Sequence, residues 1–137
     1  MKTLAKENRA AARRRWRSEL SGTRLDGLDS LSQGYGFSIA LGDLTLLNNK
    51  WYVTNGGLLR LAHRSRCCGI RIQQVREFCE ASLGRWVFKA TVYKSAGSRG
   101  FVGYGDADPS NTSPLVRGAE MLVAETRAVN RALRKAY

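Results

Sequence analysis

Arginines recur along the last stretch of the chain, and their type and spacing suit the binding of an anion. If residues 115–137 form a helix, the side opposite its apolar face carries Arg117, Arg127, Arg131 and Arg134. A guanidinium stays charged at any working pH, and its planar fork of donors fits phosphate oxygens. The alternative is a solvated helix face without a ligand. Because Glu125 is the only acid in the final dozen or so residues, we predict one wall of an anion-binding site here.

The same stretch predicts the element that holds these arginines in place. Small and apolar residues recur at alternating spacings of four and three, namely Leu115, Ala119, Leu122, Thr126, Val129, Leu133 and Ala136. Pro114 stands where a missing N–H costs least, and Ser113 can cap the first turn. We therefore expect a helix over Leu115–Tyr137 that packs along this face.

The net charge narrows the class of partner. The 137 residues include 23 Lys and Arg against 11 Asp and Glu, which gives a formal net charge of +12. Such an excess favours a polyanion; nucleic acid is the commonest, and an acidic membrane surface is second. The chain has no run of about eighteen consecutive apolar residues, so we expect no bilayer span and no membrane partner.

Catalytic constellations are sparse. The single histidine, His63, lies among arginines without a carboxylate or nucleophile at helical spacing. The glycines of residues 97–105 lack the Lys-Ser/Thr of a phosphate-binding loop, so no ATPase is indicated. Asp106 and Asp108 suit an Asx turn better than a Mg²⁺ site. We expect no catalytic residue, no cofactor and no small-molecule substrate.

The cysteines also argue against a metal. Cys67, Cys68 and Cys79 are an odd number with two adjacent, which fits neither a disulfide framework nor a CxxC pair. His63, Cys67 and Cys79 would give only a partial zinc shell. We expect buried free thiols in a reducing cytoplasm, and no metal.

Composition divides the chain into three segments. Residues 1–21 predict a basic helix or arm, with arginines around Trp16, that touches nucleic acid or a neighbouring subunit. An organellar transit peptide is the alternative. Residues 22–36, rich in Gly, Ser and Asp, predict a connector. Residues 37–137 predict the functional domain.

The pattern within residues 37–137 predicts an α+β fold. We expect strands at Phe37–Leu41, Leu44–Leu47, Lys50–Thr54, Ile70–Glu80, Arg85–Lys94 and Gly100–Gly105, with a helix at Leu58–Arg66. Tight turns make this an antiparallel β-β-β-α core, preceded by a strand pair and helix. Its long C-terminal helix should lie across the sheet face that carries Trp86 and Phe88. Gly103 and Gly105 allow a close backbone approach or a bend.

Aromatic side chains lie between the basic residues. Trp51, Tyr52, Tyr93 and Tyr104 are interleaved with cations such as Lys50, Arg85 and Lys89. Binding of single strands without sequence preference needs charge for the backbone and rings for the bases. The alternative is that Trp51 and Tyr52 are half-buried strand residues.

Three stretches, in order, resemble the annealing domain of the Rad-fifty-two single-strand annealing family of homologous recombination. They are KWYVTNGGLLRLAHRS, RWVFKATVYKSAGSRGFVGYG and, overlapping the second, GFVGYGDADPSNTSPLVRGAEMLVAETRAVNRALRKAY. In the family, too, a strand ends in V-G-Y-G and a long helix ends in R-A-L-R. The resemblance covers Gly36 to Tyr137. It implies protomers joined in a closed ring or an open arc, with single-stranded DNA in a basic outer groove.

The resemblance also implies site residues. The family's groove cations fall on Arg131 and Arg134. Asn130 stands where the family has a lysine, and Arg127 and Lys135 can compensate. Lys50 is the nearest substitute for a cation of the family's first strand. With Lys89 and Arg85, these residues complete the predicted nucleic-acid-binding set.

We therefore expect a single-strand annealing protein, ATP-independent and not an enzyme, that serves homologous recombination or DNA repair. Its partners would be single-stranded DNA and further copies of itself. It would be cytoplasmic and nucleoid-associated in a prokaryote, with organellar import as the alternative. Two other classes remain open, an RNA-binding or ribosome-associated module and a structural oligomerisation subunit.

Overall fold

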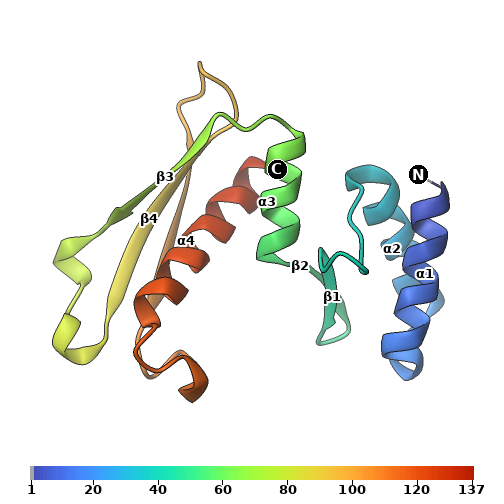
Figure 1. Cartoon of the computed structure of the whole chain (residues 1–137), viewed down its shortest axis with the longest axis horizontal. Coiled ribbons are helices and arrows are strands. Elements are labelled where there is room, and N and C mark those ends of the chain that lie inside the picture. Colours follow the sequence, from blue (N-terminus) through green and yellow to red (C-terminus); the bar gives the residue numbers. More distant parts are fainter. Residues whose placement is uncertain (1) are drawn as a thin grey trace. The chain divides into compact units, whose positions relative to one another are not determined.

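The computed structural model describes residues 2–137, which form two compact units, the first ending at Leu61 and the second comprising Ala62–Tyr137 (Figure 1). Its helices and strands are α1 Lys2–Trp16, α2 Gly22–Tyr35, β1 Leu44–Leu47, β2 Lys50–Val53, α3 Asn55–Arg64, β3 Gly69–Gln74, β4 Trp86–Tyr93, β5 Phe101–Ala107 and α4 Glu120–Ala136. Short 3-10 helices lie at Arg17–Glu19, Arg76–Phe78, Ala81–Leu83 and Pro114–Val116. The α+β class and the antiparallel sheets are confirmed. None of the helices within residues 2–137 has the length and apolar character needed to cross a membrane.

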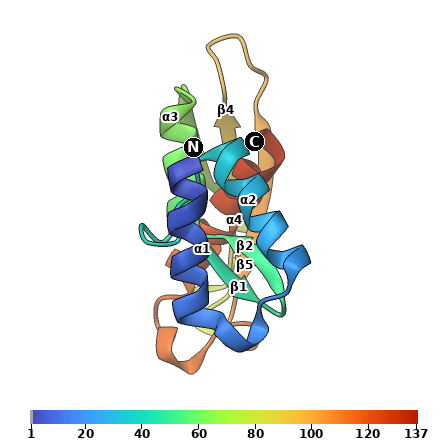
Figure 2. The same cartoon turned by 90° about the vertical axis from the view of Figure 1, so that its right-hand side faces the viewer.

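In the first unit, α1 and α2 lie side by side and cover a small core (Figure 2). The core consists of Ala11, Ala12, Leu28, Phe37, Ile39 and Leu44. Asn8 is buried beside it. Its Nδ2 donates to Ser32 Oγ and to the Phe37 carbonyl, both at 2.7 Å, and its Oδ1 accepts from the Ile39 N–H at 2.9 Å. Since its amide is thus satisfied, this asparagine ties the chain after α2 to both helices.

Two predictions for this unit are wrong. Residues 22–36 are not a connector, because most of them form α2, whose first turn Ser21 caps and which ends at Gly36 with φ of 70°. Phe37–Leu41 is not a strand, since Asn8 and Asp43 take up backbone groups that a sheet would need. Along the chain, the division between the two compact units falls between Leu61 and Ala62, inside α3. The turn at Asn48-Asn49 is confirmed, with φ of 49° and 64°.

The second unit is the predicted β-β-β-α core, with strand order β3-β4-β5 and α4 across one face (Figure 1). Phe88, Ala90 and Val92 of β4 are buried on that face. Gly103 and Gly105 of β5 lie beside Ala90 and Phe88 in the register. A Cβ at Gly103 would lie 2.3 Å from the Ala132 nitrogen, and one at Gly105 would lie 2.2 Å from the Ala128 nitrogen. Of the two alternatives for these glycines, the close backbone approach is the one that the structure shows.

The predicted start and buried face of the last helix are partly wrong. Gly118, with φ of 88°, separates α4 from the 3-10 turn that Ser113 caps. Val129, Leu133 and Ala136 are buried as predicted, but Leu115 is 95% exposed and Leu122 is 59% exposed. The stripe that rests on the two glycines is Ala124, Ala128 and Ala132. Because helix and strand backbones touch, only small side chains fit between them, and this contact sets the rotation of α4.

Candidate nucleic-acid interface

Cations of α4 reach the edge strand β5 at regular intervals. Lys135 Nζ donates to the Val102 carbonyl at 2.7 Å, Arg131 Nη1 donates to the Tyr104 carbonyl at 2.7 Å, and Arg127 Nη1 donates to the Asp106 carbonyl at 2.8 Å. Residue numbers rise along β5 as they fall along α4. We call these three pairs the cation ladder.

The regularity of the cation ladder follows from backbone geometry. Four residues of a helix rise about 6 Å, and two residues of an antiparallel strand advance about 6.8 Å. An antiparallel helix and strand at backbone contact therefore keep cations spaced at i, i+4 level with carbonyls spaced at i, i+2. The ladder spaces its positive charges about 6 Å apart, a spacing comparable with that of the phosphates of an extended single strand.

The free edge of β5 presents donors. In an antiparallel ladder, the N–H and C=O groups of one residue point to the same side of the strand. The carbonyls of Val102, Tyr104 and Asp106 receive α4 cations, so their N–H groups point to this edge as well. The edge thus combines N–H groups with positive charge and favours an anion. The Asp106 carboxylate opposes this locally, since its Oδ1 lies 3.8 Å from Arg131 Nη1.

The four predicted cations of α4 differ in what they can offer. The Arg131 side chain is 54% exposed, and its bond to Tyr104 occupies one of the five donors of a guanidinium. Arg134 and Lys135 are exposed. Arg127 is half-buried and also donates to Asn111, from Nη1 to Oδ1 at 3.0 Å and from Nη2 to the carbonyl at 2.8 Å. Arg127 therefore mainly holds the loop that follows β5.

The other predicted cations are less well placed. Lys89, on β4, is the cross-strand neighbour of Tyr104 and is half-buried. Lys50 is exposed at the start of β2 and belongs to the other unit. Arg60, a further cation of α3 outside the predicted set, has a structural role, because its Nε donates to the buried carboxylate of Asp43 at 2.9 Å.

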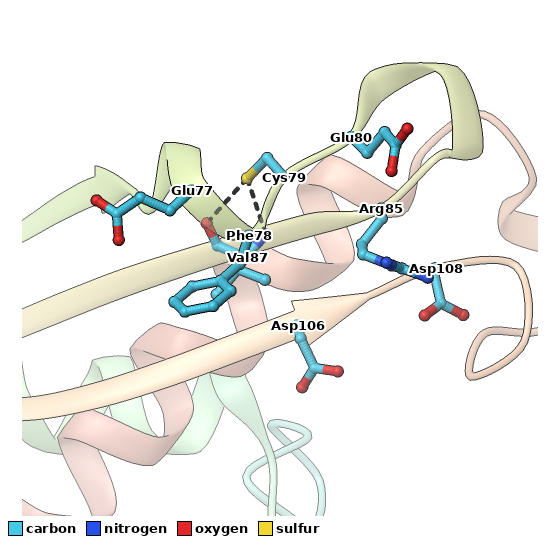
Figure 3. A pocket seen from close by; sticks show the side chains of 8 residues that line it. All are labelled: Glu77, Phe78, Cys79, Glu80, Arg85, Val87, Asp106 and Asp108. Carbon is cyan, nitrogen blue, oxygen red and sulfur yellow. Dashed lines mark hydrogen bonds between the residues drawn. The ribbon is translucent and has the colours of Figure 1, made fainter.

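Arg85 has acidic surroundings. It lines a hollow of about 440 Å³ with Phe78, Cys79, Val87 and four acids, Glu77, Glu80, Asp106 and Asp108 (Figure 3). Its side chain extends toward Asp108 (Figure 3). Hydrogen bonds from Ser110 and, more weakly, the charge of Arg85 hold the pKa of Asp108 below its usual value. Since these carboxylates repel phosphate, Arg85 is poorly placed to bind the backbone of a nucleic acid.

The geometry of the remaining candidates favours structural roles. The Asx turn is confirmed, because Asp108 Oδ1 accepts from the Ser110 N–H at 2.7 Å. Within the described part of the chain, no group of three or more His, Cys, Asp and Glu residues could hold a metal ion. The three cysteines are free thiols; Cys67 and Cys79 are half-buried, whereas Cys68 is exposed, contrary to prediction. His63 is exposed.

The first unit carries its own basic surface. The predicted N-terminal helix is confirmed as α1, and Arg13, Arg14, Arg17, Leu20 and Leu25 line a hollow of about 530 Å³. Trp51 is a half-buried strand residue, which was the alternative to a base-binding role. Its Nε1 donates to the Arg24 carbonyl at 2.8 Å, and its ring packs edge-on against Trp16. Trp51 is therefore not a platform for bases.

The cation ladder is the main feature that sequence reasoning missed. The available signal was the i, i+4, i+8 spacing of Arg127, Arg131 and Lys135 beside alternate glycines in the preceding strand. Comparison of the chain with models of protein families, with curated proteins and with solved structures finds no match.

Proposed function

We propose that this chain binds single-stranded DNA along the free edge of β5 and anneals complementary strands without ATP, in homologous recombination or DNA repair. The observation that carries the proposal is the cation ladder together with Arg134. It sets the exposed charges of Arg131, Arg134 and Lys135 beside a row of N–H donors at the sheet edge. The order of elements that resembles the Rad-fifty-two family supports the same conclusion.

The proposed mechanism needs no catalytic residue. Arginine and lysine lower the repulsion between the phosphates of two strands, and bases that face away from the cations stay available for pairing. Copies of the chain joined in a ring or an arc would keep many nucleotides extended at once. The exposed apolar side chains of Leu115, Met121 and Leu122 support self-association.

An annealing assay tests the proposal. Two complementary oligonucleotides, one with a donor dye and one with an acceptor, are mixed with the protein in the absence of ATP. We expect the protein to accelerate pairing and to bind single strands more tightly than duplex DNA. Mass photometry with and without an oligonucleotide measures the assembly.

Competition distinguishes the main alternative. Single-stranded DNA, duplex DNA and structured RNA compete for the protein at one salt concentration, because affinities at different salt cannot be compared. Preference for structured RNA would favour an RNA-binding module. Absence of strand pairing in spite of tight single-strand binding would leave a binding protein and exclude annealing.

A further inference from the structure

The face of the β3-β4-β5 sheet opposite α4 carries an exposed tyrosine. The strand register places Gln73, Lys89 and Tyr104 in one row across this face, and Arg71, Thr91 and Val102 in the next. Gln73 and Arg71 are exposed, and Tyr104 is 51% exposed. The ring of Tyr104 is thus open to solvent beside Lys89, with Asp106 two residues further along the same strand.

Tyr104 connects this open face with the free edge of β5. Its carbonyl oxygen accepts from Arg131 at 2.7 Å, whereas its side chain points away from α4 because its neighbours Gly103 and Gly105 face the helix. The backbone of Tyr104 therefore lies between the Arg131 guanidinium at the edge and its own aromatic ring on the face. A nucleotide has the matching arrangement, with its phosphate and its base on either side of the sugar.

We propose that Tyr104 stacks on a nucleobase of a single strand whose phosphate binds Arg131, so that this sheet face is a base-binding surface. The proposal rests on the proposed function and adds the group that recognises bases. Stacking uses the face of a base and leaves its hydrogen-bonding edge free, which annealing requires. The acidic hollow around Asp106 repels the strand, so its phosphates run from Arg131 toward Lys135.

Abasic DNA separates base contacts from phosphate contacts. Fluorescence anisotropy at one salt concentration compares oligo(dT) with an abasic oligonucleotide of equal length. We expect the wild-type chain to prefer oligo(dT) by about 5- to 150-fold, the range for one stacked base. Tyr104→Leu should lose this preference and Tyr104→Phe should keep it. Arg131→Ala should weaken the binding of both oligonucleotides.

The matched control is Phe78→Leu, which removes a ring that is 63% exposed but borders the acidic hollow. It should keep the preference for oligo(dT). If Tyr104→Leu, with an unchanged circular dichroism spectrum, keeps the preference too, the base-binding role of Tyr104 is wrong while the proposed function stands. If the wild-type chain binds neither oligonucleotide, both proposals fail.

Discussion

Arg131 Nη1 donates to the carbonyl oxygen of Tyr104 at 2.7 Å, and this bond links the last helix to the exposed edge of the sheet. An edge strand presents unpaired backbone groups that can recruit another strand. The cation ladder occupies these acceptors with charged side chains. The same residues can therefore protect the edge and present positive charge to a ligand.

Loss of two cations from α4 should weaken single-strand binding and reduce its dependence on salt. In the Arg131→Ala, Arg134→Ala double variant, two predicted phosphate contacts are removed. We expect the slope of log affinity against log salt concentration to become shallower by about 1.4, because each phosphate contact on a single strand contributes about 0.7. Anisotropy titrations at several salt concentrations measure this slope.

The control variant has the same net charge as the Arg131→Ala, Arg134→Ala variant, but its α4 sequence is unchanged. Arg76→Ala with Arg99→Ala removes two exposed arginines of the second unit. Its slope should change much less than that of the α4 variant. Equal changes in the two double variants would mean that net charge alone, and no defined interface, determines binding.

Arg127 should matter more for stability than for binding. Its guanidinium makes three hydrogen bonds to Asp106 and Asn111, and it is less exposed than Arg131. Arg127→Ala should lower the free energy of unfolding by about 0.5–1.5 kcal/mol, because three exposed hydrogen bonds that hold the loop are lost. Arg131→Ala should change it less. Urea denaturation of both variants checks the order, and the reverse order would contradict the role of Arg127 as a loop-holding residue.

Gly103 should tolerate no side chain. An added Cβ would lie 2.3 Å from the Ala132 nitrogen and 2.6 Å from the Ala128 carbonyl oxygen. Both are backbone atoms, and neither α4 nor β5 can move away without a large cost in free energy. Gly103→Ala should therefore destabilise the chain by about 3 kcal/mol or more. Gly69→Ala, on β3 with nothing within 4 Å of the added Cβ, should change stability by about 0.5 kcal/mol or less. Thermal unfolding compares the two, and similar melting temperatures would contradict the backbone contact.

Local periodicity was enough to predict the core of the second unit. The alternation of Phe88, Ala90 and Val92 set the buried face of β4. The glycines of β5 allowed a close backbone approach or a bend, and the structure shows the approach. The rotation of α4 could not be read from its own sequence. Leu115 and Leu122 are apolar enough to be buried, but the contact with Gly103 selects the alanine stripe instead. Only the sequence of the neighbouring strand carries that information.

Long-range hydrogen bonds limited the prediction of the first unit. Asn8 fixes the chain at Phe37 and Ile39, about thirty positions away, and no local pattern reveals such a pair. The connector was predicted from the glycine and serine content of residues 22–36. The spacing of Leu25, Leu28 and Leu31, which matches one face of a helix, was the better guide to α2. The sequence predicted which residues belong to the candidate site but did not predict how they are arranged. The cation ladder pairs side chains of α4 with carbonyls of β5, and the sequence of one element does not reveal its contacts with another.

The ion pair between Arg9 and Asp29 should make the first unit sensitive to acid. Arg9 Nε lies 2.9 Å from Asp29 Oδ1, and Nη2 lies 2.6 Å from Oδ2, a bidentate pair between α1 and α2. The hydrogen bond from Arg9 holds the pKa of Asp29 below its usual value. A carboxyl group whose pKa is lower in the folded state stabilises the fold above its unfolded pKa, about 3.9, and this contribution is lost as the pH falls through the folded value.

Asp29→Asn tests this dependence. At pH 7 the variant should unfold at a lower temperature than the wild-type chain. The difference should shrink toward zero as the pH falls through the lowered folded-state pKa of Asp29, since the wild-type carboxyl is then protonated. Tryptophan fluorescence follows unfolding of the first unit in a Trp86→Phe background, which leaves only Trp16 and Trp51. Asp26→Asn is the matched control, because Asp26 is 82% exposed and lies 3.7 Å from Arg9 Nη2, so screening by solvent should leave a smaller effect. A difference for Asp29→Asn that stays constant with pH would show that the pair does not stabilise the fold through its charge.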